Sequence, residues 1–158
     1  MNHVTCTGKI SVGAPAEQAL AVLWDIQNLK LYEPKADSAQ VEPETKTNGT
    51  YIVQGRFAGM RWRGKFSYEI NDRGFHSEML QGPSGVRVNG GFVVQAEDSR
   101  RCQITHYENY RFSHWMSPLS LPIRFYLFWA MKKELRDLAD VIQEKNKAGI
   151  WPIKGAQI

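Results

Sequence analysis

The sequence predicts an α+β domain in which an antiparallel sheet is covered on one face by a long helix. Two periodic patterns carry this prediction. Between residues 37 and 112, apolar and polar side chains alternate with a period of two, which is typical of antiparallel strands with one covered face and one solvated face. From Ile123 to Asn146, apolar side chains recur with a helical period. Both patterns together indicate a sheet followed by one long C-terminal helix.

The composition is that of a folded chain with one domain. The chain has 158 residues, of which 42% are hydrophobic and 23% are charged, so it is neither disordered nor of low complexity. A formal net charge of +4 favours an anionic partner without identifying one. We expect a single domain over residues 1–147 and a C-terminal tail without periodicity over residues 148–158.

Cysteine usage and the apolar segments indicate a cytoplasmic protein. Cys6 and Cys102 are too few for a disulfide framework. Residues 1–7 lack the apolar core of a signal peptide, and the apolar run at residues 123–131 is too short to span a bilayer. The chain has no Cys/His cluster at zinc spacing and no nucleotide-binding loop, so we expect no metal and no cofactor.

The N-terminal segment predicts a strand and two short helices. Residues 3–12 mix Val, Thr and Ile, as strands do. Pro15 suits the first turn of a helix, because its missing N–H would be unpaired there, and apolar side chains follow at helical spacing to Ile26. A second helical turn over residues 28–32 ends before Pro34, since proline disfavours helix at the residue before it.

About six strands follow, separated by turn residues. The clearest strand covers residues 60–70, and its apolar face carries Met60, Trp62, Phe66, Tyr68 and Ile70. Its wet face carries Arg61, Arg63, Lys65, Ser67 and Glu69. Another strand covers residues 75–81, and the last covers residues 102–112. Residues 89–91, Asn-Gly-Gly, fit either a turn or a bulge inside the strand that continues through Phe92.

This element order and one local pattern resemble the START-like superfamily, which includes birch-pollen-allergen-type proteins, polyketide cyclases/dehydrases and lipid-transfer proteins. The pattern runs from Val12 to Glu17 into the first helix, through residues 22–26, and on to Tyr32-Glu33-Pro34. The helix from Phe125 to Lys147 stands where the family has its cavity-covering helix. The resemblance covers residues 4–147. It implies the helix-grip fold, with a seven-stranded antiparallel sheet around the long helix and a cavity for a small hydrophobic molecule.

The last strand carries the candidate polar site. Ile104, His106, Glu108, Tyr110 and Phe112 share one face, and the Ile and Phe side chains indicate that this face points inward. His106 and Glu108 would then enter the cavity, where they are candidate acid–base residues. The structural alternatives are that another register turns them away or that they satisfy each other within the core.

The expected cavity wall is apolar, as ligand pockets usually are. Its candidate residues are Trp62, Phe66, Tyr68, Phe92, Tyr110, Met131 and Leu135. We expect the chain to bind a small, largely hydrophobic molecule such as a lipid, a quinone or a polyketide-like compound. Whether it is also an enzyme stays open, and a polyketide cyclase/dehydratase that uses cavity acid–base residues is one alternative.

Two surface features bear on partners. The basic cluster at residues 56–65 lies opposite the aromatic face, so we expect a solvated sheet surface and no nucleic acid partner, with contact to an anionic membrane surface as an alternative. The segment 122–131 is apolar nearly all round, and Phe125, Tyr126, Phe128 and Trp129 cannot all face one cavity. Packing under the tail residues Ile150, Trp151 and Ile153 is one explanation. A homodimer or a peripheral membrane contact through Phe125, Tyr126 and Trp129 is the other, and the membrane contact would suit a lipid or quinone chaperone.

Overall fold

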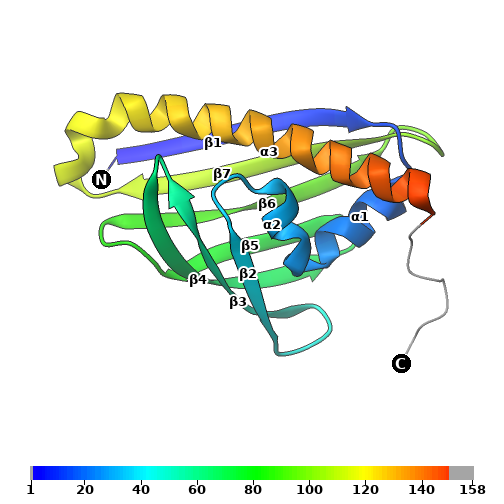
Figure 1. Ribbon diagram of the computed structural model, residues 1–158, viewed down its shortest axis with the longest axis horizontal. Coiled ribbons are helices and arrows are strands. Elements are labelled where there is room, and N and C mark those ends of the chain that lie inside the picture. Colours follow the sequence, from blue (N-terminus) through cyan, green and yellow to red (C-terminus); the bar gives the residue numbers. More distant parts are fainter. Residues whose placement is uncertain (1, 150–158) are drawn as a thin grey trace.

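The fold is an antiparallel sheet of seven strands that curves around one long helix (Figure 1). The structure is a computed structural model and describes residues 2–149. Its strands are β1 (Asn2–Val12), β2 (Ser38–Pro43), β3 (Asn48–Phe57), β4 (Met60–Asn71), β5 (Gly74–Gln81), β6 (Val86–Ala96) and β7 (Cys102–Phe112). They lie in the order β1-β7-β6-β5-β4-β3-β2. From β2 to β7 the chain therefore forms successive hairpins, and β1 pairs with β7 as an edge strand of the sheet.

The helices come at the two predicted places. They are α1 (Ala16–Trp24), the 3₁₀ helix η1 (Ile26–Asn28), α2 (Leu29–Tyr32), the 3₁₀ helix η2 (His114–Leu119) and α3 (Ser120–Ala148). Both α1 and α2 contact α3, and α1 lies near its C-terminal half (Figure 1). The α+β class and the helix-grip fold expected from the sequence are confirmed.

The long helix α3 begins at Ser120 and not at the predicted Ile123, because Pro122 is accommodated in the first turn of the helix. Its buried face consists of Ile123, Leu127, Ala130, Met131, Glu134, Leu135, Leu138, Ala139 and Ile142. The helix ends at Gly149, whose φ of 63° is left-handed and whose N–H reaches back to the last turn. Within residues 2–149, no helix combines the length and the apolar character needed to cross a membrane. The tail residues Ile150, Trp151 and Ile153 lie outside the described residues.

The predicted inward face of β7 is confirmed. Ile104, His106, Glu108, Tyr110 and Phe112 are all buried, while the residues between them are half-buried or exposed. The pairing of β7 with both β1 and β6 runs without a shift, so the pleat keeps this face constant along the strand.

The Asn-Gly-Gly segment is neither a turn nor a bulge, which corrects the expectation for residues 89–91. These residues pair in register with β7 inside the continuous strand β6. The two glycines serve close approach of neighbouring strands. A Cβ on Gly91 would lie 2.2 Å from the carbonyl oxygen of Phe75, and one on Gly90 would lie 2.4 Å from that of Tyr107.

Candidate functional site

A cavity of about 490 Å³ lies between the sheet and the first half of α3. The β3–β4 turn, the β5–β6 loop, η2 and the start of α3 surround its entrance. Four of the predicted wall residues line it, namely Trp62, Phe66, Phe92 and Tyr110. Tyr51, Phe75, Met79 and Tyr126, which were not among the predicted wall residues, add aromatic and apolar surface. The wall is therefore mainly apolar, as expected for a small-molecule pocket.

Three residues predicted for the wall lie elsewhere. Tyr68 packs in the core beside Tyr51, with ring centroids 6.0 Å apart. Met131 and Leu135 lie over β1, where a Cβ on Gly8 would be 2.6 Å from Leu135 Cδ1. The apolar stripe of α3 is wider than the cavity, so only part of it faces the empty space and the rest packs against the edge strand.

The inner part of the cavity holds a cluster of ionisable side chains, which we call the charged cluster. It consists of Glu33, Lys35, His106, Glu108 and Glu134, and all of them line the cavity. Their side chains are between 1% and 10% exposed. Buried charges on this scale are costly unless they are paired and hydrogen-bonded, so their partners decide what the site can do.

His106 bridges the sheet and the helix. Its Nδ1 lies 2.8 Å from the backbone oxygen of Gly91, and its Nε2 lies 3.1 Å from Glu134 Oε2. A carbonyl oxygen and an ionised carboxylate only accept hydrogen bonds, so both ring nitrogens donate and the ring is an imidazolium. Phe92 stacks on the ring with a centroid distance of 4.0 Å and holds its plane.

The protonation of this pair follows from competing effects. Burial opposes the charge on His106, but Glu134, Glu108 and the bond to Gly91 outweigh it and raise its pKa to about 9. Burial likewise opposes the charge on Glu134, but the imidazolium of His106 lowers its pKa, with help from Lys35 and a hydrogen bond with Glu33. The two groups therefore form an ion pair at neutral pH.

Lys35 organises the other half of the charged cluster. Its Nζ lies 3.3 Å from Glu108 Oε1 and 3.3 Å from Glu33 Oε1. Burial alone would lower the pKa of Lys35, but the two carboxyl groups raise it well above its usual value. The ammonium also lies 5.9 Å from the centroid of the Tyr110 ring, within reach of a cation–π contact.

Glu33 keeps its proton at neutral pH. Burial and the nearby charge of Glu134 raise its pKa to about 8, although Lys35 acts in the opposite direction. With Glu33 neutral, the cations Lys35 and His106 balance the carboxylates of Glu108 and Glu134. The site thus presents proton donors and carboxylate acceptors side by side in an apolar cavity.

Sequence reasoning placed His106 and Glu108 but missed the other three members. Glu134 had a readable signal, because it falls on the buried stripe of α3 between Leu127 and Leu138. Glu33 and Lys35 lie in the link between α2 and β2, where no periodicity reports burial. Trp62 holds this link in place, since its Nε1 donates to the backbone oxygen of Lys35 at 2.9 Å.

One subset of the charged cluster has the composition of metal ligands. Among residues 2–149, His106, Glu108 and Glu134 offer donor atoms that all lie within 4.8 Å of one another. Here each of them already has a partner, because Lys35 binds Glu108 and the imidazolium proton lies toward Glu134. The network of protons and ion pairs therefore satisfies these side chains by itself, and we assign no ion to them.

The arrangement of the chain is similar to that of several solved structures. The aromatase/cyclase ZhuI from Streptomyces sp. R1128 matches with a TM-score of 0.79 and 14% identity, over 94% of this chain and 98% of that chain. A START superfamily protein from Mycobacterium smegmatis matches with a TM-score of 0.76 and 9% identity, over 90% of this chain and 99% of that chain.

A third similar structure is larger than this chain. The di-domain aromatase/cyclase BexL matches with a TM-score of 0.74 and 13% identity, over 90% of this chain and 47% of that chain. No protein-family model and no curated protein sequence matches the chain. The similarity to solved structures establishes the architecture, and the chain has the helix-grip fold of START-like proteins.

Proposed function

We propose that this protein binds a small, largely hydrophobic molecule that carries one polar group. The observation that supports this best is the pairing of an apolar cavity of about 490 Å³ with a charged cluster along its inner wall. Removing the apolar part of a ligand from water would supply most of the affinity. Hydrogen bonds to Lys35, Glu33 or His106 would orient its polar group.

The cavity entrance supports entry of such a molecule from outside. Met60 and Trp115 line the cavity and are 66% and 67% exposed, so the wall continues to the protein surface. The deep end is charged and the entrance is mainly apolar, with Arg61 beside it, which favours a ligand that enters with its polar group first. Lipids, quinones and polyketide-like molecules combine a large apolar part with a polar group in this way.

Two matched variants on β6 test the binding proposal. Val88 lines the cavity, whereas Val93 lies on the outer face of the same strand and is 36% exposed. We expect Val88→Phe to fill part of the cavity and to weaken binding of the fluorescent probe anilinonaphthalene sulfonate by tenfold or more. Val93→Phe adds the same bulk to the outer face and should bind the probe as the unaltered protein does. Equal binding by both variants would place the probe outside the cavity and contradict the proposal.

A second candidate function is acid–base catalysis, and the ion pair of His106 and Glu134 favours it specifically. A carboxylate of the charged cluster would take the proton next to a ketone, and the imidazolium would donate a proton to a leaving hydroxyl group. The sum is loss of water from a β-hydroxy ketone, the dehydration that follows an aldol cyclisation. Among similar structures, ZhuI is named as an aromatase/cyclase.

The catalytic candidate has its own test. A naphthyl-substituted β-hydroxy ketone would be incubated with the protein, and formation of the conjugated enone would be followed by absorbance. We expect His106→Gln and Glu108→Gln to abolish turnover while binding of the ketone, measured calorimetrically, persists. Turnover that survives in both variants would remove these side chains from the chemistry and leave the binding role.

A further inference from the structure

A group of large apolar side chains is exposed around the cavity entrance and on the outward side of α3. We call it the entrance face, and it comprises Met60, Trp115, Leu119, Leu121, Phe125 and Trp129. Each of them is at least 51% exposed, and Phe125 reaches 70%. Exposed apolar side chains are common singly, but a contiguous group of this size marks an interaction surface.

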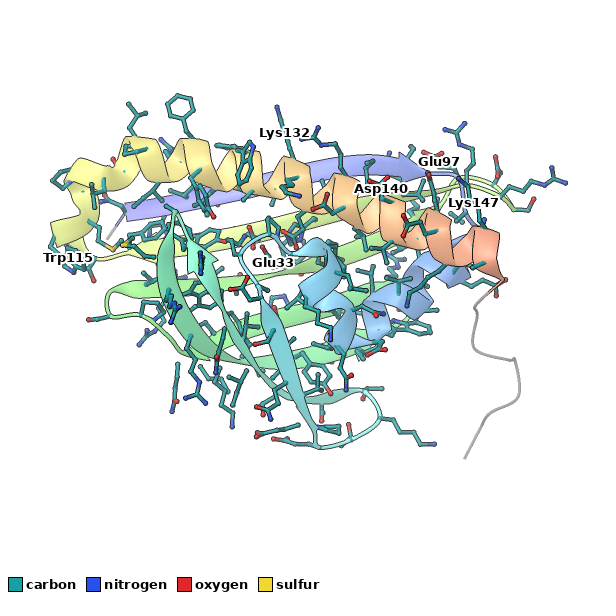
Figure 2. All side chains as sticks on the ribbon, in the orientation of Figure 1. Glu33, Glu97, Trp115, Lys132, Asp140 and Lys147 are labelled. Carbon is teal, nitrogen blue, oxygen red and sulfur yellow. The ribbon has the colours of Figure 1, made fainter. Side chains whose placement is uncertain are left out.

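The entrance face is continuous with the cavity. Met60, Trp115 and Leu119 line the cavity and are exposed at the same time. Leu121 and Phe125 follow on the first turns of α3, and Trp115 lies at the end of the molecule where this helix begins (Figure 2). Whatever covers the entrance face therefore also lies over the cavity entrance.

The aromatic side chains in the first half of α3 point in different directions, as the helical period requires. Tyr126 turns inward, lines the cavity and packs against Phe57 with ring centroids 4.7 Å apart. Phe125 and Trp129 stay outside, at 70% and 51% exposure. Within residues 2–149, nothing covers these two side chains, so this part of the chain leaves them available to an external partner.

Charge identifies the kind of partner. Residues 109–133 contain no Asp or Glu, but they include Arg111, Arg124, Lys132 and Lys133. Lys132 projects from α3 away from the sheet (Figure 2), on the turn after Phe128. Arg61 adds a further cation beside the entrance. Lys133 is neutralised by an ion pair with Asp137 on the next turn, which leaves Arg111, Arg124 and Lys132 as the cations of this stretch. An apolar aromatic face bordered by such cations has the composition of a surface that enters the headgroup region of an anionic bilayer.

We propose that the entrance face docks on an anionic lipid bilayer, with the cavity entrance turned toward the lipid. Phe125, Leu121 and Trp115 enter the interfacial region, and Lys132 and Arg124 contact the headgroups. A second copy of the chain fits this face less well, because a self-docked pair would bring the cations Arg124 and Lys132 of both copies together. Docking in this orientation lets an apolar ligand pass between bilayer and cavity without crossing water, which goes beyond the binding function proposed above.

Vesicle flotation tests the docking without any cavity ligand. Vesicles of phosphatidylcholine with phosphatidylserine should carry the protein upward, and pure phosphatidylcholine or high salt should reduce the bound fraction. Phe125→Ser and, separately, Leu121→Ser should lower the partition coefficient by about tenfold, in line with the loss of one buried apolar side chain. Leu80→Ser is the matched control, because Leu80 is 49% exposed on β5 and outside the entrance face.

Two charge-reversal variants test the electrostatic contribution to docking. Lys132→Glu should weaken flotation with the anionic vesicles, whereas Arg100→Glu, in the β6–β7 turn at the other end of the molecule, should not. Three results would overturn the proposal. They are no flotation of the unaltered protein, equal loss with Leu80→Ser, or a stable dimer in light scattering that Phe125→Ser dissociates.

Discussion

His106 on β7 and Glu134 on α3 form a buried ion pair, with Nε2 3.1 Å from Oε2. The two residues are 28 positions apart, so the contact ties the covering helix directly to the sheet at the inner wall of the cavity. Because His106 also donates to Gly91 on β6, the same ring connects three elements. The pair is thus both a structural link and the most strongly organised polar feature of the candidate site.

Removing one partner of this pair should destabilise the protein. Glu134→Leu leaves the His106 imidazolium buried without its main counter-charge, and we expect the free energy of unfolding to fall by about 3 kcal/mol or more. His106→Leu combined with Glu134→Leu should recover much of that loss, because no unpaired charge remains. Urea unfolding measures both, and Glu144→Leu, an exposed change on the same helix, should stay within about 0.5 kcal/mol. If Glu134→Leu left the free energy of unfolding unchanged, His106 and Glu134 would not form an ion pair.

Stability should fall as the pH rises from about 4.5 to 9, because Glu33 contributes a decline between pH 4.5 and 8 and His106 contributes one between pH 6.5 and 9. The pKa of His106 is raised from 6.5 to about 9, so its stabilising charge is complete below pH 6.5 and is lost as the pH rises through 9. The pKa of Glu33 is raised from 4.5 to about 8, so the folded state also holds this proton longer than the unfolded state does. Each such group contributes a slope of at most about 1.4 kcal/mol per pH unit.

Urea unfolding at a series of pH values measures this slope. Glu33→Gln removes one of the two retained protons, so its stability should decline less steeply than that of the unaltered protein up to about pH 8. On the acid side, the lowered pKa of Glu134 keeps its contribution until the pH falls below the usual carboxyl range of about 4.5. A stability that is constant from pH 6.5 to 9 would contradict the assigned protonation states.

Gly91 should be intolerant of a side chain. Its Cβ would lie 2.2 Å from the carbonyl oxygen of Phe75, so Gly91→Ala must separate β5 from β6 and shift the acceptor of His106. We expect a loss of about 2 kcal/mol or more in the free energy of unfolding. Gly13→Ala is the control, because no heavy atom would lie within 4 Å of its new Cβ. Thermal unfolding compares the two, and equal midpoints would refute the close-approach explanation.

Trp62 should position the link that carries Lys35. Trp62→Phe keeps an aromatic side chain in the wall but removes the indole N–H that donates to the backbone oxygen of Lys35. We expect a cost of about 1 kcal/mol in the free energy of unfolding and faster hydrogen exchange over residues 33–36. Trp24→Phe removes another indole hydrogen bond, to Asn71, away from the cavity, and should leave exchange in that link unchanged. Unchanged exchange in both variants would mean that other contacts hold the link.

The fold was predictable because its signals are periodic and local. The alternation of β7 correctly turned His106 and Glu108 inward, and the local pattern through Pro34 correctly marked the short helices. Residues 89–91 misled because glycine in a strand and glycine in a turn look alike in one sequence, and only the neighbouring strands reveal the close approach.

The composition of the site was predictable only in part. Only part of the buried face of α3 lines the cavity, and the rotation of the helix over the sheet decides which residues belong to that part. In the structure, Met131 and Leu135 lie over β1, while Glu134 lines the cavity. Lys35 was beyond prediction, since its burial depends on contacts with Glu108, 73 positions away.

Native mass spectrometry of the protein purified gently from its own host tests the central claim most directly. Denaturing extraction of the same sample then identifies any small molecule that was bound. We predict one small, apolar molecule with a polar group per chain, and a lower occupancy in Val88→Phe than in Val93→Phe. Chains that carry no small molecule and also fail to bind anilinonaphthalene sulfonate would contradict the claim that this cavity is a binding site.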